Sequence, residues 1–78
     1  MFRELKEIVT DNLFKITVYY NKVYINGYNE ILVFEENKIL LKTKDKIVKI
    51  QGNNLIITHL NENEVLIEGI VKNIDIGD

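Results

Sequence analysis

The arrangement of apolar side chains along residues 14–76 limits this chain to a β fold. In "FKITVYY", one phase is shared by Phe14, Ile16, Val18 and Tyr20. A two-residue period is that of a β-strand, whose successive side chains point to opposite faces. Comparable short runs follow at near-regular spacing: "VYI", "EILVFE", "KILLKT", "KIVKIQ", "LIITHL", "EVLIEG" and "VKNIDI". We therefore predict an all-β fold, a small antiparallel meander that forms a sandwich or a barrel-like sheet.

The segment before this pattern has a different period. Residues 2–12, "FRELKEIVTDN", place apolar side chains at helical spacing, at Phe2, Leu5, Ile8 and Val9. We predict one short N-terminal helix over residues 2–12. A helix of this length is marginal alone in water, so its apolar stripe should pack on the sheet or on a partner.

Turn-forming residues separate the predicted strands. The strongest signal is Asn26-Gly27, a dipeptide typical of tight β-hairpins. We interpret Gly27, Gly52 and Asn53 as structural turn residues, with a positive φ at the two glycines. Gly69 interrupts an apolar run, which predicts a bulge, a bend or a close backbone approach. Further turns are expected at Glu36-Asn37, Lys44-Asp45, 52–54 ("GNN") and 61–63 ("NEN").

Length and composition narrow the class of protein. The 78 residues allow one domain, to which we assign residues 1–78, and the absence of Cys excludes disulfides and thiolate metal sites. The first twenty residues interleave acids with bases, unlike a signal peptide. No apolar run approaches the roughly 20 residues of a membrane span, so we expect a cytoplasmic protein. With a pI near 5.4 and no basic stripe, we expect no nucleic-acid partner.

Catalytic and metal-binding patterns are weak. His59 is the only histidine, and the chain has no Ser or Cys that it could activate as a nucleophile. Glu64 and Glu68 share an outward phase, and Glu35 and Glu36 lie in a polar turn, so these acids indicate a solvated surface rather than a paired acid and base. We expect no catalytic residue, no metal and no cofactor, and a protein that is not an enzyme.

Four tyrosines lie on and beside the first predicted hairpin, at positions 19, 20, 24 and 28. Exposed aromatic side chains are enriched at protein interfaces. We take Tyr19, Tyr24 and Tyr28 as the candidate interface. The alternative is that these rings pack against the predicted helix.

The segment "IQGNNLIITHLNENEVLIEGIV" resembles a stretch shared by the YabP/YqfC family of sporulation proteins. Its pattern is an apolar residue and a Gly, then Leu-x-Ile, a turn, and alternating apolars into Glu-Gly. Upstream, "ITVYYNKVYINGYNEILVFEENKILLKT" is similar to the family's first strands. The resemblance covers roughly residues 14–76 without distinguishing the YabP branch from the YqfC branch. In this reading Gly52 and Gly69 shape the chain, and the core takes Leu55, Ile57, Leu60, Val65 and Ile67.

The resemblance implies a biological process rather than a reaction. Family members look like small non-enzymatic factors made in the mother cell during endospore formation. A module of this kind would assemble with itself or with a membrane-bound protein of the same programme, and membrane association would come through that partner. The alternative is a small β-barrel that binds a ligand or a nucleic acid.

Overall fold

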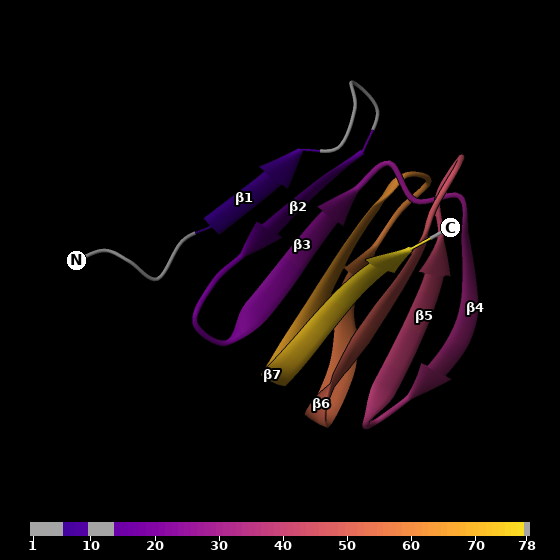
Figure 1. Ribbon diagram of the computed structural model, residues 1–78. Coiled ribbons are helices and arrows are strands. Elements are labelled where there is room, and N and C mark those ends of the chain that lie inside the picture. Colours follow the sequence, from indigo (N-terminus) through magenta and orange to yellow (C-terminus); the bar gives the residue numbers. More distant parts are fainter. Residues whose placement is uncertain (1–5, 10–13, 78) are drawn as a thin grey trace.

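The protein forms one antiparallel sheet of seven strands, seen in a computed structural model that describes residues 6–9 and 14–77 (Figure 1). The strand order is β1-β2-β3-β7-β6-β5-β4. The strands are β1 (Lys6–Val9), β2 (Lys15–Val18), β3 (Lys22–Asn26), β4 (Glu30–Glu35), β5 (Lys38–Lys42), β6 (Ile47–Leu60) and β7 (Glu64–Gly77). The all-β prediction is confirmed. Among the described strands, β1 and β4 lie at the two ends of an open sheet.

The order of the strands differs from a simple meander. Strands β4 to β7 pair in sequence, but β3 pairs with β7 instead of β4. The hairpin predicted at Asn26-Gly27 is therefore wrong. Gly27 does have a positive φ of 90°, but its N–H donates to the carbonyl of Asn63 at 2.7 Å, and the chain crosses to the far end of the sheet. The long strand β7 pairs with β3 at five positions. This ladder occupies the edge of β3 that a hairpin with β4 would have used.

The two long strands β6 and β7 bend together. The turn predicted at 52–54 is wrong, because Gly52 and Asn53 lie inside β6 and Gly52 has no positive φ. Gly52 instead allows a close approach: a Cβ there would overlap the carbonyl oxygen of Ile70. At Gly69 φ is 137°, and a Cβ would lie 2.6 Å from the carbonyl oxygen of Asn54. The strands cross tightly here, and the ladder shifts register on both sides of the crossing.

The bend divides the sheet into two halves that share one core. The β2–β3 half contains β1, β2 and β3 with residues 55–60 and 64–68. The β4–β5 half contains β4 and β5 with residues 47–51 and 71–77. Both halves bury one face in a single apolar cluster, so they face each other, as in a sandwich. The fully buried side chains of this cluster include Ile16, Val23, Ile25, Ile39, Leu41, Val48, Ile50, Val65 and Ile67.

The core prediction for residues 55–67 is correct at most positions. Leu55, Val65 and Ile67 are buried, and Ile57 is half-buried against the cluster. Leu60 is 52% exposed, so its assignment to the core is wrong. The register shift between Ile57 and His59 places Leu60 opposite the buried Val65, but Leu60 is the last residue of β6 and the core does not cover it there.

Turns from both halves dock on the bend. The N–H of Leu55 donates to the carbonyl of Glu36 in the β4–β5 turn at 2.7 Å. The N–H of Gly69 donates to the carbonyl of Asn21 in the β2–β3 turn at 3.1 Å. These bonds satisfy backbone groups that the irregular ladder leaves without strand partners.

The N-terminal helix is replaced by a strand over the residues that the structure describes. Lys6–Val9 forms β1, which pairs antiparallel with β2 from Lys6 opposite Val18 to Val9 opposite Lys15. The rest of the predicted helix, residues 2–5 and 10–12, lies outside the described residues. A helix of about three turns has little stability of its own, whereas the edge of β2 presents backbone donors and acceptors that a strand can satisfy.

The close approach at Gly52 predicts a large cost for any side chain there. We expect Gly52→Ala to destabilise the protein by about 3 kcal/mol, because the new Cβ meets backbone rather than a movable side chain. In a domain of this size that lowers the Tm by more than roughly 10 °C. Gly77→Ala is the control, since a Cβ at Gly77 meets nothing within 4 Å. Equal Tm values for the two variants in thermal unfolding would contradict this account of the bend.

Candidate functional site

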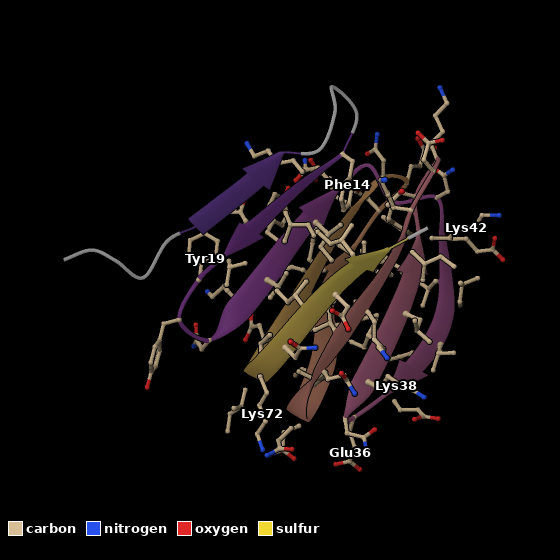
Figure 2. The ribbon with its side chains drawn as sticks, viewed as in Figure 1. Phe14, Tyr19, Glu36, Lys38, Lys42 and Lys72 are labelled. Atoms are coloured by element: carbon tan, nitrogen blue, oxygen red, sulfur yellow. The ribbon has the colours of Figure 1, made fainter. Side chains whose placement is uncertain are left out.

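The structure separates the three tyrosines that the sequence selects. Tyr19 follows β2 and is 42% exposed, and Tyr24 is half-buried on β3. With Lys22 and Leu66 they line a shallow open pocket of about 320 Å³, which we call the tyrosine pocket. The ammonium nitrogen of Lys22 lies 5.9 Å from the centroid of the Tyr19 ring, within cation–π range. Figure 2 shows Tyr19 beside β2, on the opposite side of the molecule from Lys38 and Lys42 on β5.

Tyr28 has a different position. It is only 9% exposed and belongs to the core cluster. Its hydroxyl donates to the carbonyl oxygen of Asn61 at 2.8 Å. Together with the bond between Gly27 and Asn63, this contact ties the β3–β4 connection to the β6–β7 turn. Tyr28 thus positions two loops and lies away from the tyrosine pocket.

Beside the pocket is a polar cluster that the sequence did not single out. Its centre is the Glu64 carboxylate, which accepts from the side-chain amides of Asn61 at 3.2 Å and Asn26 at 3.3 Å. The hydroxyl of Tyr24 also interacts with this carboxylate. The Asn61 side-chain oxygen accepts from the N–H of Glu64 at 3.0 Å, which closes the turn. The one signal in the sequence for this hydrogen-bonded cluster is Asn61, which starts a polar turn.

The cluster changes the acidity of two of its members in opposite directions. Hydrogen bonds from Tyr24 and Asn61 hold the pKa of Glu64 below its usual value, and the nearby His59 acts in the same sense. The pKa of Tyr24 is raised, mainly by its hydrogen bond to Glu64. A carboxyl held ionised in this way is a hydrogen-bond acceptor, and a poor general acid near neutral pH.

His59 and Glu68 lie on the same outer surface as the Glu64 cluster, but their side chains have hydrogen-bond partners other than its carboxylate. His59 is exposed on β6, with its Nε2 3.5 Å from the side-chain nitrogen of Asn61. Glu68 accepts from the hydroxyl of Thr58 at 3.2 Å. Glu35 and Glu36 lie at the end of β4, in the other half of the sheet.

Within the described ranges, residues 6–9 and 14–77, no group of three or more His, Cys, Asp or Glu side chains is placed to hold a metal ion. The same residues contain no helix long and apolar enough to cross a membrane.

The fold and these surfaces define a small β module in which polar side chains order turns and aromatic side chains line a shallow open pocket. The chain belongs to the YabP family, whose model matches residues 15–78. This is a family associated with sporulation. The resemblance noted in the sequence is thereby confirmed at the level of the family. Comparison with curated proteins and with solved structures gives no match.

The buried hydroxyl of Tyr28 should contribute to stability. We expect Tyr28→Phe to lower the free energy of unfolding by about 1 kcal/mol, because the bond to Asn61 is lost while the ring stays in the core. Tyr20→Phe removes a hydroxyl from a side chain that is 88% exposed and should leave stability unchanged. Urea unfolding of both variants measures the difference. A Tyr28→Phe protein as stable as the Tyr20→Phe protein would show that the bond does not hold the loops.

Glu64 should make stability depend on pH on the acid side. Because its pKa is lower in the folded chain than its ordinary value of 4.5, the ionised carboxylate stabilises the fold above that value. This contribution is lost as the pH falls through the lowered pKa of the folded state. Glu64→Gln should therefore flatten the dependence of the urea midpoint on pH in this range. Glu62→Gln, which removes an exposed carboxylate from the same turn, should leave the slope as it is in the wild type, and equal slopes in all three proteins would contradict the assignment.

Proposed function

We propose that this protein is a non-enzymatic factor of endospore formation, a small β module that acts in the mother-cell cytoplasm by assembling with other proteins. The observation that carries the proposal is the family match over residues 15–78. A domain of this size has a thin margin of stability, and docking on a partner or on further copies increases it by mass action. Membrane association in this proposal comes from a membrane-bound partner.

The tyrosine pocket is the surface that we propose for this partner. Tyr19 and Tyr24 present rigid rings that lose little conformational entropy on binding, and such side chains often dominate binding energy. Leu66 adds an apolar wall, and Lys22 adds a positive charge at the rim. The pocket therefore suits a peptide segment that carries an apolar side chain next to a carboxylate. Tyr28 is left out of this surface because it is buried.

Heat-resistant spore yield tests the proposal in the organism that encodes the chain. A clean deletion should cause a large loss of heat-resistant spores, and restoring the wild-type gene should recover them. A Tyr19→Ala/Tyr24→Ala gene should fail to restore the yield, whereas Tyr20→Ala, which changes an exposed neighbour outside the pocket, should restore it. Each variant is first purified and checked for an intact thermal transition, so that loss of folding is not mistaken for loss of binding.

Two outcomes would contradict the proposal separately. An unchanged yield in the deletion strain would remove the role in spore formation. Full restoration by the Tyr19→Ala/Tyr24→Ala gene would leave that role intact and would remove the tyrosine pocket as the partner surface.

A further inference from the structure

The outer strand β4 combines exposed apolar side chains with acidic ends. Its outer edge pairs with no described strand. Leu32 is 43% exposed and Phe34 is 53% exposed, and they lie between the carboxylates of Glu30 and Glu35. The strand carries no Lys and no Pro, the residues that most often protect an edge strand from pairing. Its protective features are a bulge between Ile31 and Val33 and the charges of the two terminal glutamates.

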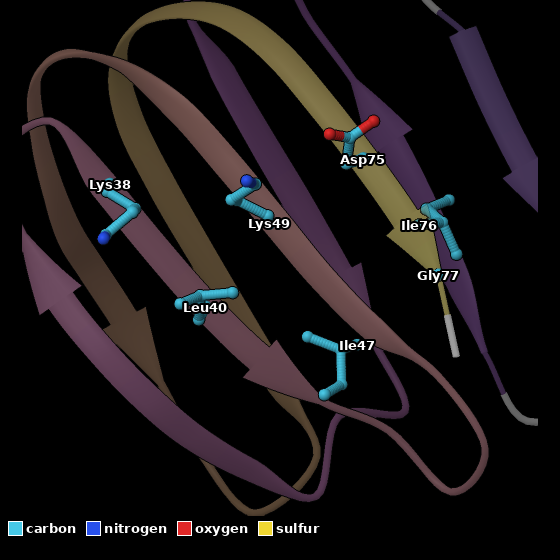
Figure 3. A pocket seen from close by; sticks show the side chains of 7 residues that line it. All are labelled: Lys38, Leu40, Ile47, Lys49, Asp75, Ile76 and Gly77. Atoms are coloured by element: carbon cyan, nitrogen blue, oxygen red, sulfur yellow. The ribbon is translucent and has the colours of Figure 1, made fainter.

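The same half of the sheet has a hollow lined by two lysines and one aspartate. Figure 3 shows Lys38 on β5 and Lys49 on β6 near the side chains of Leu40 and Ile47. Together with Asp75, Ile76 and Gly77 of β7, these residues line an open hollow of about 520 Å³, which we call the lysine hollow. Asp75 lies opposite Lys49 on the neighbouring strand, so two ammonium groups and one carboxylate leave the hollow with one net positive charge. Its apolar floor fits aliphatic or aromatic side chains, and its two ammonium groups fit carboxylates placed on either side of them. Five of the ten basic residues of the chain lie within residues 38–49.

The acidic strand and the lysine hollow complement each other in charge and in apolar character, and both belong to the β4–β5 half. A molecule that carries two complementary patches on one face can pair with a copy of itself about a two-fold axis, so that each patch of one copy meets the other patch of its partner. Within one chain, Glu35 lies opposite Lys38 and Glu30 opposite Lys42 as cross-strand neighbours on the sheet. Those side chains remain at the surface, where a second copy can reach them.

We propose that the protein forms a symmetric dimer in which strand β4 of each copy occupies the lysine hollow of the other. Leu32 supplies the apolar contact over Leu40 and Ile47, and Glu30 and Glu35 face Lys38 and Lys49. This inference rests on the proposed function in one respect, because it names self-assembly as one form of the assembly suggested above. It uses a different surface from the tyrosine pocket, so a single chain could bind its copy and a membrane-bound partner together.

Charge reversal tests the dimer with the purified full chain. One variant is Glu30→Lys/Glu35→Lys, which makes both patches basic, and the other is Lys38→Glu/Lys49→Glu, which makes both acidic. In sedimentation velocity the wild type should be a dimer, and each variant alone should be a monomer. An equimolar mixture of the two variants should form a heterodimer, because each contact between the patches then joins opposite charges. A surface that associates through non-specific apolar contacts would not regain a dimer when the two variants are mixed.

Several results would overturn the proposal. They are a monomeric wild type, a charge variant that remains a dimer, or a mixture that stays monomeric although both variants are folded by circular dichroism. If the wild type is a monomer, the lysine hollow would instead be a candidate site for another protein whose strand carries acidic and apolar side chains.

An uncharged substitution keeps the test decisive if a charge variant fails to fold. Leu32→Asn should weaken the dimer by roughly tenfold or more, as truncation of a central apolar contact does. Ile70→Asn changes a side chain that is 57% exposed on β7 and should leave the dimer unaffected. Equal dissociation constants for the two variants would overturn the proposal. Because dimerisation is measured on the purified chain, its failure is distinguishable from a failure of the spore-yield assay.

Discussion

The close approach of β6 and β7 at Gly52 and Gly69 is the constraint on which the rest of the structure depends. Neither position has room for a Cβ, because the carbonyl groups of the opposing strand lie where it would be. This allows two strands of 14 residues to bend as a pair. The bend turns one open sheet into two facing halves with a common core. Without it, a flat sheet would leave one apolar face in water.

The bend also explains the family resemblance in physical terms. The stretch quoted above for the resemblance, residues 50–71, contains both glycines of the crossing and the polar turn between the two strands. The N–H of Gly52 donates to the carbonyl of Asn37 at 3.2 Å, so the crossing also receives the β4–β5 turn. Glycine is needed at the two positions of the crossing because the backbone leaves no room there for a Cβ. The shared sequence pattern therefore identifies a fold, and the family's role in sporulation comes with the family match.

The surfaces available for assembly follow from the same geometry. Folding the sheet over buries the inner faces and leaves two outer faces with different chemistry. The outer face of the β2–β3 half carries the tyrosine pocket and the hydrogen-bonded Glu64. The outer face of the β4–β5 half carries the lysine hollow beside an acidic edge strand. Because the two faces point away from each other, the proposed partner and the proposed second copy would not compete for the same surface.

The sequence by itself determined the strands, most of the turns, the buried phase and the family, because alternation and turn chemistry act between residues close together in the chain. Only the tertiary structure decided that β3 pairs with β7, that 52–54 continues a strand, and that residues 6–9 extend the sheet. It also decided that Tyr28 is buried and that Glu64 meets Asn26 across 38 positions. These outcomes depend on which strands compete for the same backbone partners and on which loops then come into contact. Such contacts form between segments far apart in the chain, and local periodicity carries no information about them.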